Sequence, residues 1–282
     1  MVRHSFKAPL ILLLVFGIFI FLLPCGVFAQ TGNQAPVAND DEAVTAKNTL
    51  IIIDVASNDS DPDGNLNQNS ADLPDPSEGP YNGTAVSNGD GTITYTPNTD
   101  FIGTDTFVYK ICDTGVPALC NTALVTIEVA VPVAVDIKPG SCPNPFNLKS
   151  RGVLPVAILG TPDLDIATID RASIRLQIGT QEVTPIRSSM EDVATPFTGE
   201  ITSCEDCAES GPDGYIDLTL KFSTQEIVQA IGVNNVNDGD CFILTLTGRL
   251  DDGTPIIGED VLRILKKGKV KLPKSPKPPK NT

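Results

Sequence analysis

Short runs of alternating apolar and polar residues recur along the chain, separated by clusters of Asn, Asp, Gly and Pro. This pattern predicts β-strands, because side chains alternate between the two faces of an extended segment. Phe107, Tyr109 and Ile111, for example, fall on one face, as in a half-buried strand. The strands predicted in the first half are residues 42–46, 50–55, 83–87, 92–96, 106–112 and 123–129, and the polar, Pro-rich residues 65–80 are predicted to form a long loop.

The second half of the chain, residues 133–265, also lacks long helical periodicity. One short helix is predicted at residues 223–231, because Ser223 is a preferred N-cap and Glu226 follows three residues later. Asp251-Asp252-Gly253-Thr254 is typical of a hairpin turn. The predicted strands are residues 153–159, 173–178, 216–222, 241–248 and 261–265. With a boundary at Ala130-Val131-Pro132, the pattern predicts an all-β chain of two β-sandwich domains, residues 34–130 and 133–265.

The amino terminus is typical of a secretory signal peptide. Arg3, His4 and Lys7 precede a nearly continuous apolar stretch, and Ala29 offers a small residue before a cleavage site. We therefore expect residues 1–29 to be removed and the protein to be secreted or held at the cell surface. A retained membrane anchor is the alternative, although the apolar stretch at residues 9–23 is short for a span of about 20 residues.

An acidic loop follows the predicted strand at residues 50–55. Asp59, Asp61 and Asp63 stand at every second position and are followed by Gly64. Ca²⁺ prefers six to eight oxygen ligands from flexible loops, so this spacing predicts a calcium site. An EF-hand would need flanking helices and a Glu at the twelfth loop position, which is Ser70 here. The alternative is an ordinary solvated turn, since Asp, Asn, Pro and Gly all favour turns.

Residues 34–129 resemble a cadherin-like, immunoglobulin-type repeat of the kind found in tandem on bacterial surface proteins. The resemblance is carried by Ala35-Pro36-Val37-Ala38-Asn39-Asp40-Asp41, Asn58-Asp59-Ser60-Asp61-Pro62-Asp63-Gly64, Gly83-Thr84, Gly91-Thr92-Ile93-Thr94-Tyr95-Thr96-Pro97 and Phe101-Ile102-Gly103-Thr104-Asp105-Thr106-Phe107-Val108-Tyr109. It implies that Ca²⁺ binds at the junction with a neighbouring domain, with Asp40, Asp41, Asp59, Asp61 and Asp63 as ligands. A single repeat is present, so a site shared between repeats would be incomplete.

The second half resembles a module of undescribed function near the carboxyl ends of secreted bacterial and archaeal proteins. The matching residues are Val135-Asp136-Ile137-Lys138-Pro139-Gly140-Ser141, Pro143-Asn144, Gly152-Val153-Leu154-Pro155-Val156-Ala157-Ile158-Leu159, Asp213-Gly214-Tyr215-Ile216-Asp217-Leu218, Thr224-Gln225-Glu226 and Asp252-Gly253-Thr254-Pro255-Ile256. Asp213 and Asp217 are candidates for a second Ca²⁺ site, with Asp192, Glu205 and Asp206 nearby in sequence. Because Asp-Gly is first a turn former, an ordinary turn is the alternative.

The charge is strongly asymmetric. The full chain has 20 basic and 35 acidic residues, and seven lysines but no acid lie in residues 266–282. The acidic body argues against nucleic acid as a partner, because that binding rests on cationic contacts with phosphate. It suits carboxylates that are partly neutralised by divalent cations, although solubility alone also accounts for it. The Lys- and Pro-rich tail, residues 266–282, is predicted to be disordered, either solvated or in contact with an anionic envelope polymer.

Six cysteines remain after the predicted cleavage, an even number that favours disulfides in an exported protein. Cys112 ends one predicted strand and Cys120 precedes the next, so we expect this pair to close a hairpin. In the second half we favour the pairs Cys142–Cys241 and Cys204–Cys207. A zinc site that uses these same four cysteines is the alternative.

Catalytic groups are scarce. The only histidine, His4, lies in the predicted signal peptide, and no Gly-rich phosphate loop is present. The chain has no Trp and only four Tyr, whereas sugar sites usually contain aromatic platforms. We therefore expect a calcium-binding adhesion or structural protein without catalytic activity, which contacts other surface proteins or envelope polymers. The alternatives are a calcium-dependent carbohydrate-binding protein, with glycans as partners, and a hydrolase accessory domain that uses paired carboxylates.

Overall fold

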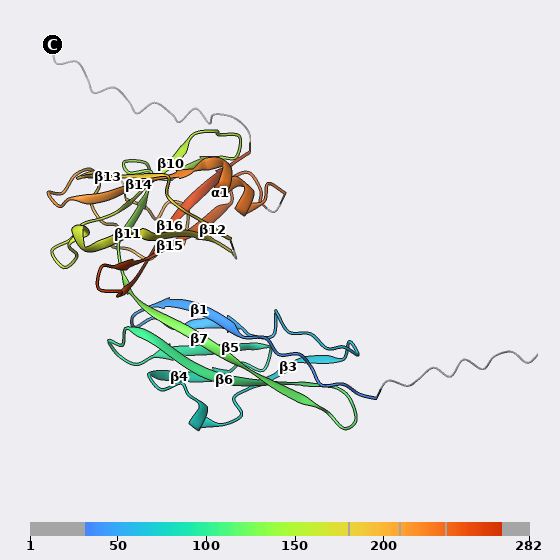
Figure 1. The fold of residues 1–282 in the computed structure, drawn as a ribbon. Helices are drawn as coiled ribbons and strands as arrows, with labels where there is room; N and C mark the ends of the chain where they lie inside the picture. Colours follow the sequence, from blue (N-terminus) through green and yellow to red (C-terminus); the bar gives the residue numbers. More distant parts are fainter. Residues whose placement is uncertain (1–31, 180, 209, 235, 267–282) are drawn as a thin grey trace, which may run out of the picture. The chain divides into compact units, whose positions relative to one another are not determined.

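A computed structural model describes residues 32–179, 181–208, 210–234 and 236–266. Over these residues the chain is almost entirely β-structure, so the predicted all-β class is confirmed (Figure 1). The predicted signal peptide and nearly all of the Lys-rich tail lie outside the described residues. Within the described part, no helix has the length and apolar character needed to cross a membrane.

The first domain is a sandwich of two sheets that enclose their own core (Figure 1). In one sheet β7 pairs in parallel with β1 and antiparallel with β6, which also pairs with β3; the other sheet has the order β2-β5-β4. Phe107, Tyr109 and Ile111 are fully buried, as their alternation predicts. The strands are β1 (Asp41–Ala46), β2 (Ile51–Asp54), β3 (Leu66–Asp72), β4 (Gly83–Ser87), β5 (Thr92–Pro97), β6 (Gly103–Asp113) and β7 (Cys120–Pro132).

One element of this domain differs from the prediction. Residues 65–80 are not a continuous loop, because they contain β3 and a short 3-10 helix (Pro76–Glu78). β3 pairs with β6 with a change of register, and the Ser70 hydroxyl accepts a hydrogen bond from the Cys112 amide at 2.8 Å. Only Ala71 of β3 is buried. An edge strand of this kind needs few apolar residues, which is why its sequence is typical of a loop.

The second domain has a separate core, and its strands belong to a four-stranded sheet and to the nine-stranded sheet that also contains β7 and β6. One sheet has the order β13-β14-β10-β8; in the other, β12-β11-β15-β16 are neighbours and β9 pairs with β16. The strands are β8 (Val135–Ile137), β9 (Pro145–Asn147), β10 (Val153–Ile158), β11 (Ile169–Ile178), β12 (Gln181–Val183), β13 (Arg187–Glu191), β14 (Asp217–Ser223), β15 (Cys241–Leu250) and β16 (Pro255–Leu265), with a 3-10 helix at Ile166–Thr168.

The single helix predicted in this domain is confirmed. It is α1 (Thr224–Ile231), and the Ser223 hydroxyl caps it by accepting a hydrogen bond from the Glu226 amide at 3.4 Å. The predicted hairpin turn at Asp251–Thr254 is also present, since the Leu250 amide donates to the Thr254 carbonyl at 2.8 Å. β16 begins at Pro255 and is longer than the predicted strand at residues 261–265. The prediction was too short because Glu259 and Asp260 interrupt the apolar pattern of the sequence.

All six described cysteines form disulfides, but two of the predicted pairs are wrong. Cys112–Cys120 closes the β6–β7 hairpin as expected. In the second domain, the bonds are Cys142–Cys207 and Cys204–Cys241. Residues 203–206 form a turn stabilised by the Asp206 carboxylate. Cys204 lies within this turn and Cys207 directly after it, and the two reach different partners. These bonds use the four cysteines of the alternative zinc site, which is therefore excluded as well.

Candidate metal centre

The acidic cluster of the first domain is built where the chain enters β1. The Asp40 carboxylate accepts a hydrogen bond from the Leu124 amide of β7 at 2.9 Å. Asp41, the first residue of β1, accepts one from the Asn58 side-chain amide at 3.0 Å. The same Asn58 amide group donates to the Asp40 carbonyl at 3.1 Å. Asn58 therefore joins the beginning of β1 to the turn that follows β2.

Asp59 lies in that turn and is held from two sides. Its Oδ1 accepts a hydrogen bond from the Asn39 amide at 2.7 Å. The hydroxyl of Tyr109, a buried residue of β6, lies 2.9 Å from Oδ1 and 2.8 Å from Oδ2. Burial and the hydrogen bond to Asp59 raise the pKa of Tyr109, which stays a neutral donor. The core of the sandwich thus fixes the position of Asp59 beside the beginning of β1.

The Asp41 carboxylate lacks a complete set of partners. Its Oδ2 is buried and has no hydrogen-bond partner among the described residues. Burial, followed by the charge of Asp59 and then those of Asp40 and Asp54, raises the pKa of Asp41 to about 7. None of the ion pairs within the described part of the chain involves these four residues. The arrangement concentrates negative charge without a basic side chain to balance it.

The remaining two predicted ligands serve a different local role. Asp61 Oδ1 accepts a hydrogen bond from the Asp63 amide at 2.8 Å, as in an Asx-turn. The Asp63 carboxylate accepts hydrogen bonds from the Gln34 backbone and side-chain amides, at 2.6 and 3.1 Å. Over the described ranges, no group of three or more Asp, Glu, His or Cys side chains is placed closely enough to hold a metal ion by itself. A site here therefore needs neutral oxygens in addition to carboxylates.

The structure adds one acidic residue to this cluster that the sequence analysis did not include. Asp54 ends β2, directly before the turn that carries Asp59, and its charge acts on Asp41. Its exposed position at the end of an apolar strand is the signal that could have identified it.

The second predicted calcium site does not assemble around Asp213 and Asp217. Asp217 is fully buried and accepts hydrogen bonds from the Gly160, Val193 and Ala194 amides, at 2.9, 2.7 and 3.2 Å. Asp213 is exposed and accepts a bond from the Tyr215 amide. The two carboxylates share no partner.

The nearby acidic residues form hydrogen bonds or an ion pair that stabilise the fold. Asp192 accepts bonds from the amides of Asp213 and Gly214, Asp206 caps its own turn, and Glu205 pairs with Arg263 at 3.1 Å.

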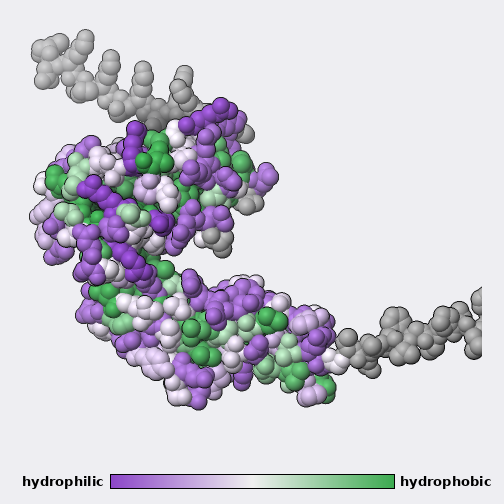
Figure 2. Space-filling model, viewed as in Figure 1, coloured by the Kyte–Doolittle hydropathy of each residue, from purple (hydrophilic) through white to green (hydrophobic). Residues whose placement is uncertain are grey.

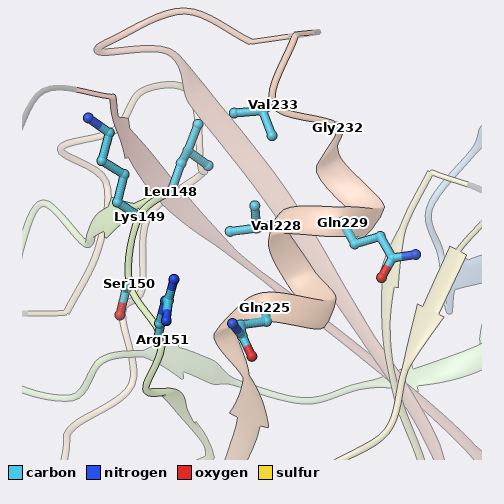
Figure 3. A pocket seen from close by; sticks show the side chains of 9 residues that line it. All are labelled: Leu148, Lys149, Ser150, Arg151, Gln225, Val228, Gln229, Gly232 and Val233. Carbon is cyan, nitrogen blue, oxygen red and sulfur yellow. The ribbon is translucent and has the colours of Figure 1, made fainter.

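Two open grooves of the second domain offer little acid–base chemistry. One, of about 610 Å³, lies between α1 and residues 148–151 (Figure 3). It is lined by Leu148, Lys149, Ser150, Arg151, Gln225, Val228, Gln229, Gly232 and Val233, with no carboxylate. The other, of about 660 Å³, contains a single carboxylate, Asp238. On the face shown in Figure 2, polar residues predominate, with apolar ones scattered among them.

Comparison with known proteins identifies the domain that carries the acidic cluster. Residues 33–128 match the family model described as Bacterial Ig domain. These residues are similar to a bacterial Ig domain, and residues 33–128 are called the bacterial Ig domain below. The predicted resemblance to a cadherin-like, immunoglobulin-type repeat is thereby confirmed for the first half, whereas the resemblance of residues 133–265 to a carboxyl-terminal module stays a prediction. No curated protein matches the chain.

The chain also shows distant likenesses to solved structures. A nucleoside hydrolase-related hypothetical protein from Saccharophagus degradans, associated with carbohydrate metabolism, is 22% identical over 34% of this chain and 26% of its own, with a TM-score of 0.26. Protocadherin Gamma C5 EC1-3 is 11% identical over 82% and 67%, with a TM-score of 0.25. Endo-fucoidan hydrolase MfFcnA9 is 13% identical over 84% and 35%, with a TM-score of 0.28. At these values the likenesses carry no argument about function.

Proposed function

We propose that the protein is a structural or adhesion module of the cell exterior, without catalytic activity, whose bacterial Ig domain binds Ca²⁺ beside Asp41 and Asp59. The observation that carries this proposal is the Asp41 carboxylate. One of its oxygens is buried without a partner among the described residues, and neighbouring acids are not balanced by a base. A bound divalent cation would supply both the missing partner and the missing charge.

The donor chemistry fits calcium. The groups around Asp41 are the carboxylates of Asp40, Asp54 and Asp59 and neutral oxygens of the adjoining turns, and Ca²⁺ prefers oxygen ligands of these kinds. The fold holds two of the carboxylates in place: Asn58 donates hydrogen bonds to Asp41 and to the Asp40 carbonyl, and the Tyr109 hydroxyl bonds to Asp59. When bound, the ion would neutralise the cluster.

Stiffening of the domain is the expected consequence. The candidate ligands come from the beginning of β1, the end of β2 and the turn that follows it, and these segments repel one another while their carboxylates are ionised. An ion that binds only the folded arrangement stabilises it by mass action. A stiffened domain can present a fixed end to other surface proteins or envelope polymers. Binding of glycans, and contact of the basic tail with an anionic envelope polymer, stay predictions.

An exterior location agrees with the chemistry of the fold. The bacterial Ig domain and the three disulfides indicate an extracellular or surface protein, since disulfides persist in oxidising compartments. Cleavage after Ala29 stays a prediction.

Terbium luminescence tests the site. Tb³⁺ substitutes for Ca²⁺ at oxygen-rich sites and emits when a nearby tyrosine transfers its excitation; the chain has no Trp, and the Tyr109 hydroxyl touches Asp59. We expect tyrosine-sensitised emission that Ca²⁺ displaces and that Asp41→Asn abolishes. Asp90→Asn, an exposed turn position of the same domain, is the matched control and should leave the emission unchanged. Emission that is equally strong in Asp41→Asn would place the ion elsewhere.

A further inference from the structure

The groove between α1 and residues 148–151 is a basic surface on an otherwise acidic chain (Figure 3). Its lining includes Lys149 and Arg151 but no carboxylate. The full chain has 35 acidic and 20 basic residues, and seven of the basic residues belong to the tail at residues 266–282. Because acids predominate in the rest of the chain, a groove with two cations and no acid indicates a site for a negatively charged ligand.

The exposed side of α1 forms one wall of this groove. Ile227 and Ile231 of the helix are buried in the core of the second domain, which fixes the orientation of the helix. Gln225 and Gln229, four residues apart, therefore share the opposite side together with Val228. Each glutamine amide can donate and accept hydrogen bonds. This wall supplies neutral hydrogen-bonding groups next to a small apolar surface.

The opposite wall is a turn held by hydrogen bonds of its backbone. The Leu148 amide donates to the Leu265 carbonyl at 3.1 Å, and the Ser150 amide donates to the Asn147 carbonyl at 2.9 Å. The Lys149 amide donates to the Asn147 side-chain oxygen at 2.9 Å. Because these amides are already paired within the fold, the turn offers a ligand its side chains rather than a free strand edge.

The two basic side chains of the groove are available to a ligand. Lys149 and Arg151 are exposed, and neither belongs to an ion pair within the described ranges of the chain. A guanidinium group can bind a carboxylate through two parallel hydrogen bonds, whereas an ammonium group acts as a point charge. Together they can hold one or two carboxylates of a ligand.

The neutral groups of the groove indicate what carries the carboxylate. Gln225, Gln229 and Ser150 lie among the cations and can exchange hydrogen bonds with hydroxyl groups. No aromatic side chain is among the described lining residues, so a neutral sugar would find no stacking platform. A uronate, which is a sugar with a carboxylate, replaces stacking with charge. An acidic peptide fits less well, since the paired amides of the turn leave no strand edge for its backbone.

We propose that this groove binds a polymer of acidic sugars, with Lys149 and Arg151 on the carboxylates and Gln225 and Gln229 on the hydroxyl groups. Its volume of about 610 Å³ lies within the roughly 300–1,000 Å³ of typical ligand sites. The inference deepens the proposed function by giving the chemistry of the envelope polymer, and it rests on that function only for the exterior location. The groove shares no residue with the calcium site beside Asp41.

Calorimetric titration of the protein, tail included, with a short oligogalacturonate tests the groove. Excess chelator is present because Ca²⁺ itself binds uronate carboxylates, and the ionic strength is physiological, where isolated exposed charges are screened. The double variant Lys149→Gln/Arg151→Gln should weaken binding about tenfold, as expected for loss of one charge-assisted hydrogen bond. Arg171→Gln/Arg187→Gln removes the same charge at exposed positions of the same domain and should bind like wild type. Equal affinity of the two double variants would overturn the proposal.

Two comparison ligands test the chemical class. A neutral oligosaccharide of the same length should not bind, and an oligoglutamate of the same charge should bind more weakly than the oligogalacturonate. Gln225→Ala/Gln229→Ala should abolish this preference, and it should stay folded because Ala is a strong helix former. Oligoglutamate that binds wild type as tightly as the oligogalacturonate would overturn the sugar assignment in favour of an acidic protein. Asp41→Asn should leave oligogalacturonate binding unchanged, so the calcium site and the groove can fail separately.

Discussion

Removal of the Tyr109 hydroxyl gives the most specific test of how the fold holds its acidic cluster. Tyr109 is fully buried, and its hydroxyl lies 2.9 and 2.8 Å from the two oxygens of Asp59. Tyr109→Phe removes this donor and leaves the ring in the core. A hydrogen bond to a charged acceptor contributes about 1.5–3 kcal/mol, so we expect the free energy of unfolding to fall by that amount.

The same domain offers a matched control. Tyr95 is also fully buried, and its hydroxyl donates to the Asp105 carboxylate at 2.8 Å. Tyr95→Phe should therefore cost a similar amount of stability. The two variants should differ in Ca²⁺ affinity: a residue that orients a metal ligand typically contributes 10- to 100-fold, so Tyr109→Phe should weaken binding by about tenfold, whereas Tyr95→Phe should leave it unchanged.

Urea denaturation in excess chelator measures the stabilities, and calcium titration measures the affinities. Tyrosine fluorescence is a suitable signal, because the chain has no Trp and three of its four Tyr, at positions 81, 95 and 109, belong to the bacterial Ig domain. Equal Ca²⁺ affinity in the two variants would refute the role of Tyr109 in positioning Asp59.

Two other predictions concern the second domain. Mass spectrometry of peptides from the non-reduced protein should recover the pairs Cys142–Cys207 and Cys204–Cys241, and a peptide closed between Cys204 and Cys207 would contradict the described fold. Gly258→Ala should destabilise the protein by about 1–3 kcal/mol, because a Cβ atom there would meet Val135 Cγ2 at 2.4 Å and the Val133 carbonyl oxygen at 2.5 Å. Gly152→Ala is the control, because an added Cβ atom there would meet its nearest neighbour at 3.8 Å, an ordinary van der Waals contact. Equal stability of the two variants would show that β16 does not approach β8 so closely.

Much of the fold could be predicted from the sequence because strands and caps follow local patterns. The alternation at Phe107, Tyr109 and Ile111 shows which face is buried, and Ser223 with Glu226 marks the beginning of the helix. The alternation does not identify a strand whose residues are mostly polar. β3 has only one buried residue, and the first half of β16 was not predicted because Glu259 and Asp260 interrupt its apolar pattern.

The site was only partly predictable, for a related reason. Spacing in the sequence brings Asp59, Asp61 and Asp63 together, but the fold turns Asp59 towards Tyr109 and Asp63 towards Gln34. Long-range pairing decides which acid joins the cluster, as it decides the cysteine partners. Asp136 illustrates the limit: between two apolar residues its position predicts an exposed side chain, whereas it is buried in the fold.

Thermal unfolding in millimolar Ca²⁺ and in excess chelator, followed by tyrosine fluorescence, tests the central proposal most directly. Wild-type protein should be stabilised by Ca²⁺, by about 2.7 kcal/mol at a hundredfold excess over the dissociation constant, and Mg²⁺ should not reproduce the effect. Asp41→Asn should remove the response of the bacterial Ig domain, whose tyrosines dominate the signal. An unfolding temperature that is the same with and without Ca²⁺, or a shift that persists undiminished in Asp41→Asn, would contradict a calcium site beside Asp41 and Asp59.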